Sequence, residues 1–502
     1  MQNPQHACRL ARRAFLLGSA ATLAGLPELA QAQGQAQSQA PDARPVSPIR
    51  TAPLSPRIAG FVTSFDLKQA PAEAIQRART AFVDTVGVTL AGSTETSAEI
   101  VRDMVKEEGA APAVSVIGST LKTSPQLAAL ANGVASHALD FDFTFQQGQM
   151  MAPVIPALLP LAEKFDASPS EVLAAFMVGF EVCSRLGRAN PTQAGEGAWH
   201  ATSTIGAISA AVACARLMKL PASKILDVIG IAVSLASGVN ANYGTMTKPL
   251  HAGHAAKNGM MAAVLGGKGF TSNHAALEGR GGFFATFGRG MAISTEPFND
   301  LGKQFDLVEI GYRPKRYPCG GVIHTGIDAA LMIRDELGPR VSDIASIKAG
   351  ISKYAASRAK PEYPTDMEAA KFNLQYVVGY SLVHGAPHLA SFEPDAIKDE
   401  RTRAMAQKVA VALDPEFDNA HEDYPTRVAV TLKDGRTIEK LVVYASGTPK
   451  NPMSAAQLRD KFFDCADHAK VARGNAEKIA AILDKLGDQS SFGELWPLLR
   501  KT

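Results

Sequence analysis

The sequence predicts a mainly α fold in which an all-helical domain carries an inserted, smaller α+β lid domain. Three observations lead to this expectation. Apolar residues recur at helical spacing through most of residues 58–310. The segment 427–443 alternates apolar and polar residues on both sides of Asp434-Gly435, which is typical of a β-hairpin. Helical patterning then returns after Pro452, so the helical domain is expected to combine residues 58–310 with residues 446–500.

The N-terminus has the pattern of an export signal. Residues 11–26 read ARRAFLLGSAATLAGL, an arginine pair followed by an apolar run too short to span a bilayer. With the small-x-small site AQA at 30–32, this predicts a twin-arginine-like signal peptide at 1–32 and a periplasmic mature protein. An ordinary secretory signal with a chance arginine pair is the alternative. Residues 33–57, rich in Gln, Ala and Pro, are expected to form a disordered linker.

Within residues 58–310 several helix starts have recognisable caps. Ser124-Pro125 has the order of an N-cap and a first helical residue, and Ser168 and Glu171 have the spacing of a capping box. Residues 202–218 and 222–238 are rich in Ala, Gly and Ser, whose small size lets helices approach closely. These features predict a compact helical bundle.

The α+β domain is expected at residues 311–445. The segment 346–352 alternates like a strand, a helical pattern covers 367–384, and the hairpin follows at 427–443. A cleft between such a domain and a helical domain is a favoured place for a small-molecule site.

The composition argues against several classes of protein. Hydrophobic residues make up 46% of the chain, charged residues 20%, and the net charge is +3, which is typical of a globular protein rather than a nucleic-acid or membrane-surface protein. No membrane span is expected in the mature chain. The five cysteines contain no CxxC pair, so zinc and iron–sulfur sites lack their usual spacing. We expect the mature chain's cysteines to be buried and unpaired.

Basic residues recur at three-residue steps in TKPLHAGHAAKNGMMAAV, residues 247–264. They are Lys248, His251, His254 and Lys257. Pro249 suits a first helical turn, which puts Lys248 at a helix N-terminus, where an ammonium and free N–H groups can bind a carboxylate. A solvated basic face is the alternative. A metal pair at His251 and His254 is another, although the Glu of the HExxH pattern is absent.

Two further stretches hold candidate chemistry. In NGVASHALDFDFT, 132–144, Asp140 and Thr144 would share a helix face if the helix continued, and the carboxylate could bind or move a proton. His200 precedes Thr202 and Ser203, which could cap the next helix, and it could act as an acid–base group. The alternatives are solvated carboxylates at a helix end and a packed, hydrogen-bonded histidine.

Positive charge is clustered at the expected domain junction. Arg313, Lys315 and Arg316 lie together there, and His324 and Asp328 follow at helical spacing. Such a cluster at a cleft rim indicates recognition of an anionic substrate. A structural junction with surface charges fits the spacing equally well.

Taken together, these stretches resemble one family. HALDFDFT, WHATSTIGA, MTKPLHAGHAAKNG, KGFTS, KRYPCGGVIHTGIDA and KFNLQY occur in the order seen in the MmgE/PrpD family, over about residues 58–490. That family includes 2-methylcitrate dehydratases, cis-aconitate decarboxylases and iminodisuccinate epimerases. The resemblance implies a helical domain plus an α+β lid, a homodimer, no metal and no organic cofactor.

The resemblance also implies roles for residues. Lys248 and Lys315 would bind carboxylates, Asp140 and His200 would handle protons, and Thr144 would line the same site. The prediction assigns Asp140, His200, Lys315 and Thr144 to catalysis, and Lys248, His251 and Arg316 to substrate binding.

The chain departs from the family pattern at three places. Phe143 stands where the family often has a second Asp, FQQGQMMAP at 145–153 lacks a histidine that commonly precedes a proline there, and Gly320 replaces a Cys or His. The expected function is an exported, cofactor-independent lyase or isomerase that removes a proton next to a carboxylate of a small di- or tricarboxylate. Dehydration, decarboxylation and epimerisation remain open as outcomes. The alternative is a catalytically reduced periplasmic carboxylate-binding protein. No nucleic-acid partner is expected.

Overall fold

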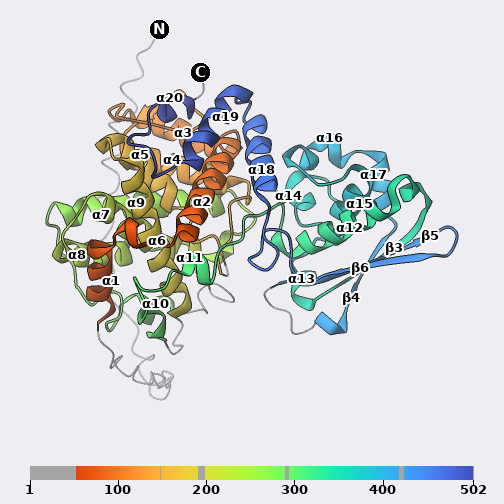
Figure 1. Ribbon diagram of the computed structural model, residues 1–502, viewed down its shortest axis with the longest axis horizontal. Coiled ribbons are helices and arrows are strands. Elements are labelled where there is room, and N and C mark those ends of the chain that lie inside the picture. Colours follow the sequence, from red (N-terminus) through yellow and green to blue (C-terminus); the bar gives the residue numbers. More distant parts are fainter. Residues whose placement is uncertain (1–52, 147, 190–197, 289–292, 418–422, 501–502) are drawn as a thin grey trace, which may run out of the picture. The chain divides into compact units, whose positions relative to one another are not determined.

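The computed structural model describes residues 53–146, 148–189, 198–288, 293–417 and 423–500 (Figure 1). The predicted signal peptide at 1–32 and residues 33–52 of the predicted linker lie outside the described residues. The prediction that the linker extends to residue 57 is wrong for its last part, because helix α1 begins at Leu54. Leu54 and Ser55 are buried, and the Ser55 hydroxyl donates a hydrogen bond of 2.8 Å to Glu278.

The helical part of the chain draws its helices from both ends of the sequence. Phe462 and Ile479, near the C-terminus, belong to the same buried cluster as Ile58 and Phe82. The helices are α1 (Leu54–Ser64), α2 (Ala72–Gly92), α3 (Thr96–Glu108), α4 (Pro125–Ala138), α5 (Val154–Phe165), α6 (Pro169–Ala189), α7 (Ala201–Leu217), α8 (Ala222–Leu235), α9 (Thr247–Gly267), α10 (Phe283–Phe287), α11 (Asp306–Glu309), α18 (Ala455–His468), α19 (Arg473–Asp484) and α20 (Leu495–Leu498). A small ladder pairs β1 (Val114–Ser115) with β2 (Lys122–Thr123).

The α+β part has its own core, whose members all lie between Tyr317 and Val442. Its elements are α12 (His324–Leu337), β3 (Ile344–Ile351), α13 (Lys353–Arg358), α14 (Met367–Ala370), α15 (Leu374–His384), α16 (Pro394–Ile397), α17 (Glu400–Ala406), β4 (Val409–Leu413), β5 (Thr426–Leu432) and β6 (Thr437–Val442).

A four-stranded sheet organises this part, in the order β4-β3-β5-β6. β3 runs parallel to β4 and antiparallel to β5, and β5 pairs antiparallel with β6. Val430 of β5 lies opposite Ile347 of β3 and Ile438 of β6, which fixes the register. Figure 1 shows α12 and α15 along one face of the sheet, where their apolar residues meet the buried side chains of the strands.

The structure confirms the mainly helical fold with an inserted α+β part. The hairpin around Asp434-Gly435 forms between β5 and β6. The helical pattern of 367–384 is interrupted, because the Asn373 side chain accepts a hydrogen bond from Tyr376 N and starts α15 anew. That the α+β part acts as a lid stays a prediction.

Two further expectations concern the described residues alone. The cysteines among them, Cys183, Cys214, Cys319 and Cys465, are all buried and unpaired, as predicted. In the same stretches of chain, no helix combines the length and the apolar character needed to cross a bilayer.

Candidate active site

Asp140 lies where helix α4 has just ended. The helix stops at Ala138, and Asp140 adopts a left-handed backbone conformation with φ of 52°, which Asp tolerates better than most residues. The chain therefore turns away from the helix axis here. The expectation that Asp140 and Thr144 share a helix face is wrong, because no helix continues past residue 138.

Two lysines from distant parts of the sequence converge on this carboxylate. Lys248 Nζ lies 2.6 Å from Asp140 Oδ1, and Lys315 Nζ lies 2.7 Å from Oδ2. Lys315 also donates to the Asp140 backbone carbonyl. Burial by itself would raise the pKa of Asp140, but the charges of Lys248 and Lys315 outweigh it and hold that pKa well below 3.8. Asp140 is therefore an ionised carboxylate enclosed by two ammonium groups.

The start of α9 explains the position of Lys248. Met246 is the N-cap, Lys248 is the second helical residue, and Pro249 occupies the first turn, where its missing N–H has no helical partner to lose. The predicted helix start is confirmed. The positive end of the helix dipole and the Lys248 ammonium both favour a carboxylate at this point.

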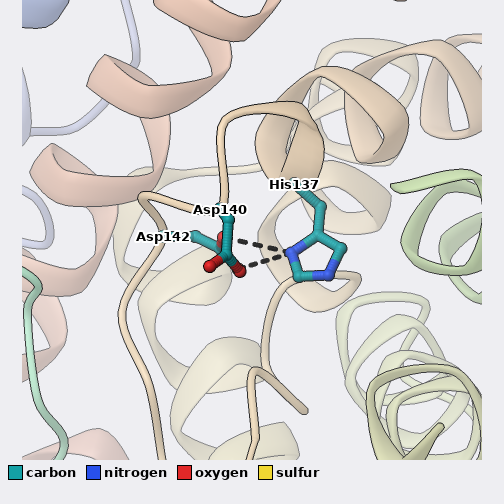
Figure 2. Close-up of side chains that lie close together, drawn as sticks. All are labelled: His137, Asp140 and Asp142. Atoms are coloured by element: carbon teal, nitrogen blue, oxygen red, sulfur yellow. Dashed lines mark hydrogen bonds and ion pairs between the residues drawn. The ribbon is translucent and has the colours of Figure 1, made fainter. Parts of the chain in front are cut away.

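A buried histidine and two polar side chains complete the surroundings of Asp140. His137 Nδ1 lies 3.1 Å from both carboxylate oxygens of Asp142, as Figure 2 shows for the group His137, Asp140 and Asp142. Gln149 Nε2 donates to Asp140 Oδ1 at 2.8 Å and to Asp142 Oδ1 at 3.2 Å. The Gln149 amide thus bridges two carboxylates, and an amide does not act as an acid or a base at neutral pH.

His200 and His251 form a pair beside this group. Their Nδ1 atoms are 3.0 Å apart, so one ring must accept the hydrogen bond that the other donates. Burial and the nearby positive charges lower the pKa of His200 to about 2, and burial lowers that of His251. The His200 ring stacks on His137 at 5.7 Å and meets the edge of Tyr243 at 5.0 Å. A neutral His200 therefore links the Asp140 region to Tyr243.

His200 itself is the N-cap of α7, so Thr202 and Ser203 lie inside the helix. The expectation that they cap it is wrong.

The contacts of two predicted site residues, Thr144 and Arg316, are with residues other than Asp140 and the two lysines. The Thr144 hydroxyl donates to the carbonyl of Arg313 at 3.4 Å, and the backbones of these two residues pair. Arg316 lies 3.1 Å from the Ser446 hydroxyl and 3.6 Å from Asp328 and stacks on Tyr317. These contacts give both residues a structural role at the junction; their assignment to catalysis and substrate binding stays a prediction.

Three residues at the site were missed by the sequence prediction: His137, Gln149 and Tyr243. His137 stands three residues before Asp140 in the HALDFDFT motif, so its place in that motif was an available signal. Gln149 and Tyr243 carry no such signal, because their proximity to Asp140 and His200 depends on how the chain turns after α4 and before α9.

The glycines of α4 and α9 hold the two helices in backbone contact. A Cβ added at Gly133 would lie 2.6 Å from Gly253 Cα, so no side chain fits between them.

The Asp140 loop has a second support from the C-terminal part of the chain. Lys461 of α18 donates to the Phe141 carbonyl at 2.7 Å and pairs with the buried Asp84 at 2.6 Å. The carboxylate and the lysine of α9 are thus fixed by packing on both sides.

The ligand set of His137, Asp140 and Asp142 lies within 4.8 Å and is the kind of group that can hold a cation. Here both Asp140 oxygens accept hydrogen bonds from ammonium groups. A divalent ion would have to displace a lysine and remain beside positive charge, so the local electrostatics oppose a metal. His251 and His254 do not converge either, since His254 contacts Ser237 and Asn258. The expectation of no metal and no organic cofactor stays a prediction.

Comparison with known proteins accounts for both parts of the chain. Residues 56–296 match the MmgE/PrpD N-terminal domain and residues 317–486 match the MmgE/PrpD C-terminal domain. The chain belongs to the MmgE/PrpD family. The two MmgE/PrpD domains meet between residues 296 and 317, close to where the core of the helical part gives way to that of the α+β part. The resemblance inferred from the motifs is confirmed.

Two cis-aconitate decarboxylases match most of the chain, and a 2-methylcitrate dehydratase matches about a third of it. The cis-aconitate decarboxylase of Homo sapiens is 29% identical over 442 residues, which cover 85% of this chain and 90% of the relative. The cis-aconitate decarboxylase of Aspergillus terreus is 26% identical over 456 residues, covering 85% and 92%. The mitochondrial 2-methylcitrate dehydratase of Yarrowia lipolytica is 26% identical over 178 residues, covering 33% and 34%.

Proposed function

We propose that this protein is a cofactor-independent lyase that acts on a small tricarboxylate or dicarboxylate. The observation that carries the proposal is the pair of ammonium groups of Lys248 and Lys315 on the single carboxylate of Asp140. The same pair is a ready site for a substrate carboxylate of the same charge and geometry. The names of the relatives support the substrate class, since they act on cis-aconitate and 2-methylcitrate.

The geometry suggests how a substrate would activate the site. An incoming carboxylate competes with Asp140 for the two ammonium groups. Each ammonium that turns to the substrate weakens the hold on Asp140, which raises the pKa of its carboxyl and makes it a stronger base. Substrate binding would in this way produce the base that the ion pairs with Lys248 and Lys315 suppress.

The chemistry then follows from where the charge develops. Removal of a proton next to a carboxylate, or loss of CO2, leaves an electron pair on carbon that spreads into the neighbouring carboxylate. Lys248, Lys315 and the N-terminal amides of α9 are fixed before the reaction, so they stabilise this enolate-like charge without reorganising. Loss of hydroxide from the next carbon gives dehydration, and return of a proton to the other face gives epimerisation.

A second candidate is a carboxylate-binding protein without turnover. Two features of the site favour it: the two lysines that hold Asp140 ionised, and Gln149, whose amide bridges the two carboxylates and cannot transfer a proton. Both candidates bind the same ligands, so only turnover or proton exchange separates them.

Proton NMR of the mature protein in deuterated water tests the proposal. The panel is cis-aconitate, citrate, 2-methylcitrate and iminodisuccinate. The lyase or isomerase is supported if wild type converts a panel member or exchanges its α-proton, and if the Asp140→Asn and Lys315→Met proteins do neither. The matched control is Lys478→Met, which removes an exposed lysine of α19. Binding of one panel member without any exchange supports the binding protein. If no panel member binds or exchanges, both candidates are contradicted.

Export and assembly are part of the same proposal. The motif in residues 11–32 supports a periplasmic mature protein, which N-terminal sequencing of the secreted protein would test. The family resemblance supports a homodimer, which sedimentation would test.

A further inference from the structure

The proposed reaction needs an acid as well as a base, and the predicted site residues do not provide one. Asp140 is held ionised by two lysines, and His200, with a pKa of about 2, carries no extra proton at neutral pH. Gln149 has no transferable proton. If Lys248 or Lys315 gave up a proton, it would lose the charge that holds the substrate. These residues therefore leave the role of acid to another side chain.

Tyr243 lies in the right place and is free to act. It follows the 3-10 helix Asn240–Asn242, four residues before α9 begins, and its ring edge packs on His200 at 5.0 Å with an interplanar angle of 78°. Tyr243 is 44% exposed, in contrast to the buried His200 beside it. Among the described residues, none forms a hydrogen bond with its hydroxyl. The ring is thus anchored on a site histidine while the hydroxyl remains available to a ligand.

The electrostatics keep the proton on this hydroxyl. Partial burial and the negative charge of Asp140 together raise the pKa of Tyr243 to about 12. At neutral pH Tyr243 is therefore a protonated donor next to the charged site.

We propose that Tyr243 is the proton donor of the reaction, a role that rests on the proposed function. In decarboxylation the C–C bond breaks, its electron pair stays on carbon, and CO2 leaves. That pair takes the proton of the Tyr243 hydroxyl, because a carbanion is far more basic than a tyrosinate. In dehydration the C–O pair leaves on oxygen, and the same proton completes a water molecule.

The exposure of Tyr243 allows its hydroxyl to be reprotonated after each turnover. The tyrosinate formed in either case takes a proton from solvent, which reaches the side chain directly. The high pKa favours this return at neutral pH.

The variant Tyr243→Phe isolates the hydroxyl. Phenylalanine keeps the ring and its edge contact with His200, so the fold should be unchanged, and the thermal unfolding midpoint verifies this. The matched control is Tyr444→Phe, which removes the hydroxyl of a tyrosine in the α+β part, 3.1 Å from Lys450 Nζ. Each protein is tested with cis-aconitate and with 2-methylcitrate for kcat, KM and, by calorimetry, Kd.

The expected result is a fall in kcat of at least about 100-fold for Tyr243→Phe, the usual contribution of a general acid. The Kd should stay within about twofold of wild type, and the Tyr444→Phe control should match wild type in both. Equal kcat in wild type and Tyr243→Phe would overturn the role of Tyr243 but leave the proposed function standing. A higher KM with unchanged kcat would overturn it too, since the hydroxyl would then only bind substrate. A wild type that converts neither compound would overturn the proposed function, and this role with it.

Discussion

Replacing Gly253 with alanine is expected to push apart the two helices that carry Asp140 and Lys248. A Cβ at Gly253 would lie 2.4 Å from the Leu130 carbonyl oxygen and 3.0 Å from Val134 N. Ordinary Cβ contacts begin at 3.4 Å, so α9 must move by about 1 Å relative to α4. Both contacts are with helix backbone, so no rotation of a side chain relieves them.

The size of the effect follows from this displacement. Overpacking of a closely packed interface costs about 1–3 kcal/mol in the free energy of unfolding. A shift of about 1 Å in a positioned group can lower turnover by up to about 100-fold. Lys248 is five residues from Gly253 on the same helix, and its ammonium now lies 2.6 Å from Asp140. We expect kcat to fall by about 10-fold to 100-fold.

The assay combines urea unfolding with kcat on the substrate identified by NMR. Gly474→Ala is the matched control, because this α19 glycine has no heavy atom within 4 Å of the added Cβ. The control should change the free energy of unfolding by no more than about 1 kcal/mol and leave turnover intact. If Gly253→Ala behaves like the control, the close approach of the two helices does not position the site and the reasoning is wrong.

Two further predictions follow from buried charges. Lys461→Met should lower the free energy of unfolding by about 3–5 kcal/mol, because it leaves Asp84 buried without its partner. Lys461→Met should also lower turnover, because the Phe141 carbonyl loses its hydrogen-bond donor. Adding Asp84→Asn should restore part of the stability but not the turnover, and full recovery of kcat in the double variant would contradict this. Asp140→Asn should destabilise the protein most above about pH 4, because the folded-state pKa of Asp140 lies well below the unfolded value of about 3.9. The stabilisation by ionised Asp140 is lost as the pH falls below about 4, so the difference in unfolding free energy between variant and wild type should shrink there; a difference independent of pH would refute the assignment.

Local signals were sufficient for much of the fold. The hairpin around Asp434-Gly435 and the helix whose first turn contains Pro249 are both indicated by neighbouring residues, and the structure confirms both. The start of α1 was missed because Pro53 and Pro56 in a Pro-rich stretch look like linker. In the structure these prolines occupy the N-cap and the first turn, where a missing N–H costs nothing.

The site was only partly predictable. The motif resemblance located Asp140, Lys248 and Lys315, and the structure brings these three together. Their mutual contacts could not be derived from spacing, since 108 residues separate Asp140 from Lys248 and 175 separate it from Lys315. Gln149 illustrates the limit: its position between two carboxylates depends on the left-handed turn at Asp140, which no helical or strand pattern indicates.

The hydrogen bond from Lys461 to Phe141 has a consequence for how the protein is made. The two residues are 320 positions apart, so at about 5–20 residues per second a ribosome needs roughly 16–64 s to travel from one to the other. Lys315 is made 146 positions before Lys461, so for roughly the last 7–29 s of that interval the nascent chain contains the Asp140 loop and both lysines that bind it, but not the C-terminal helix that supports the loop. The binding site would therefore reach its final geometry only near the end of translation, and a chain cut short before residue 461 would contain every predicted catalytic residue but leave the Asp140 loop unsupported.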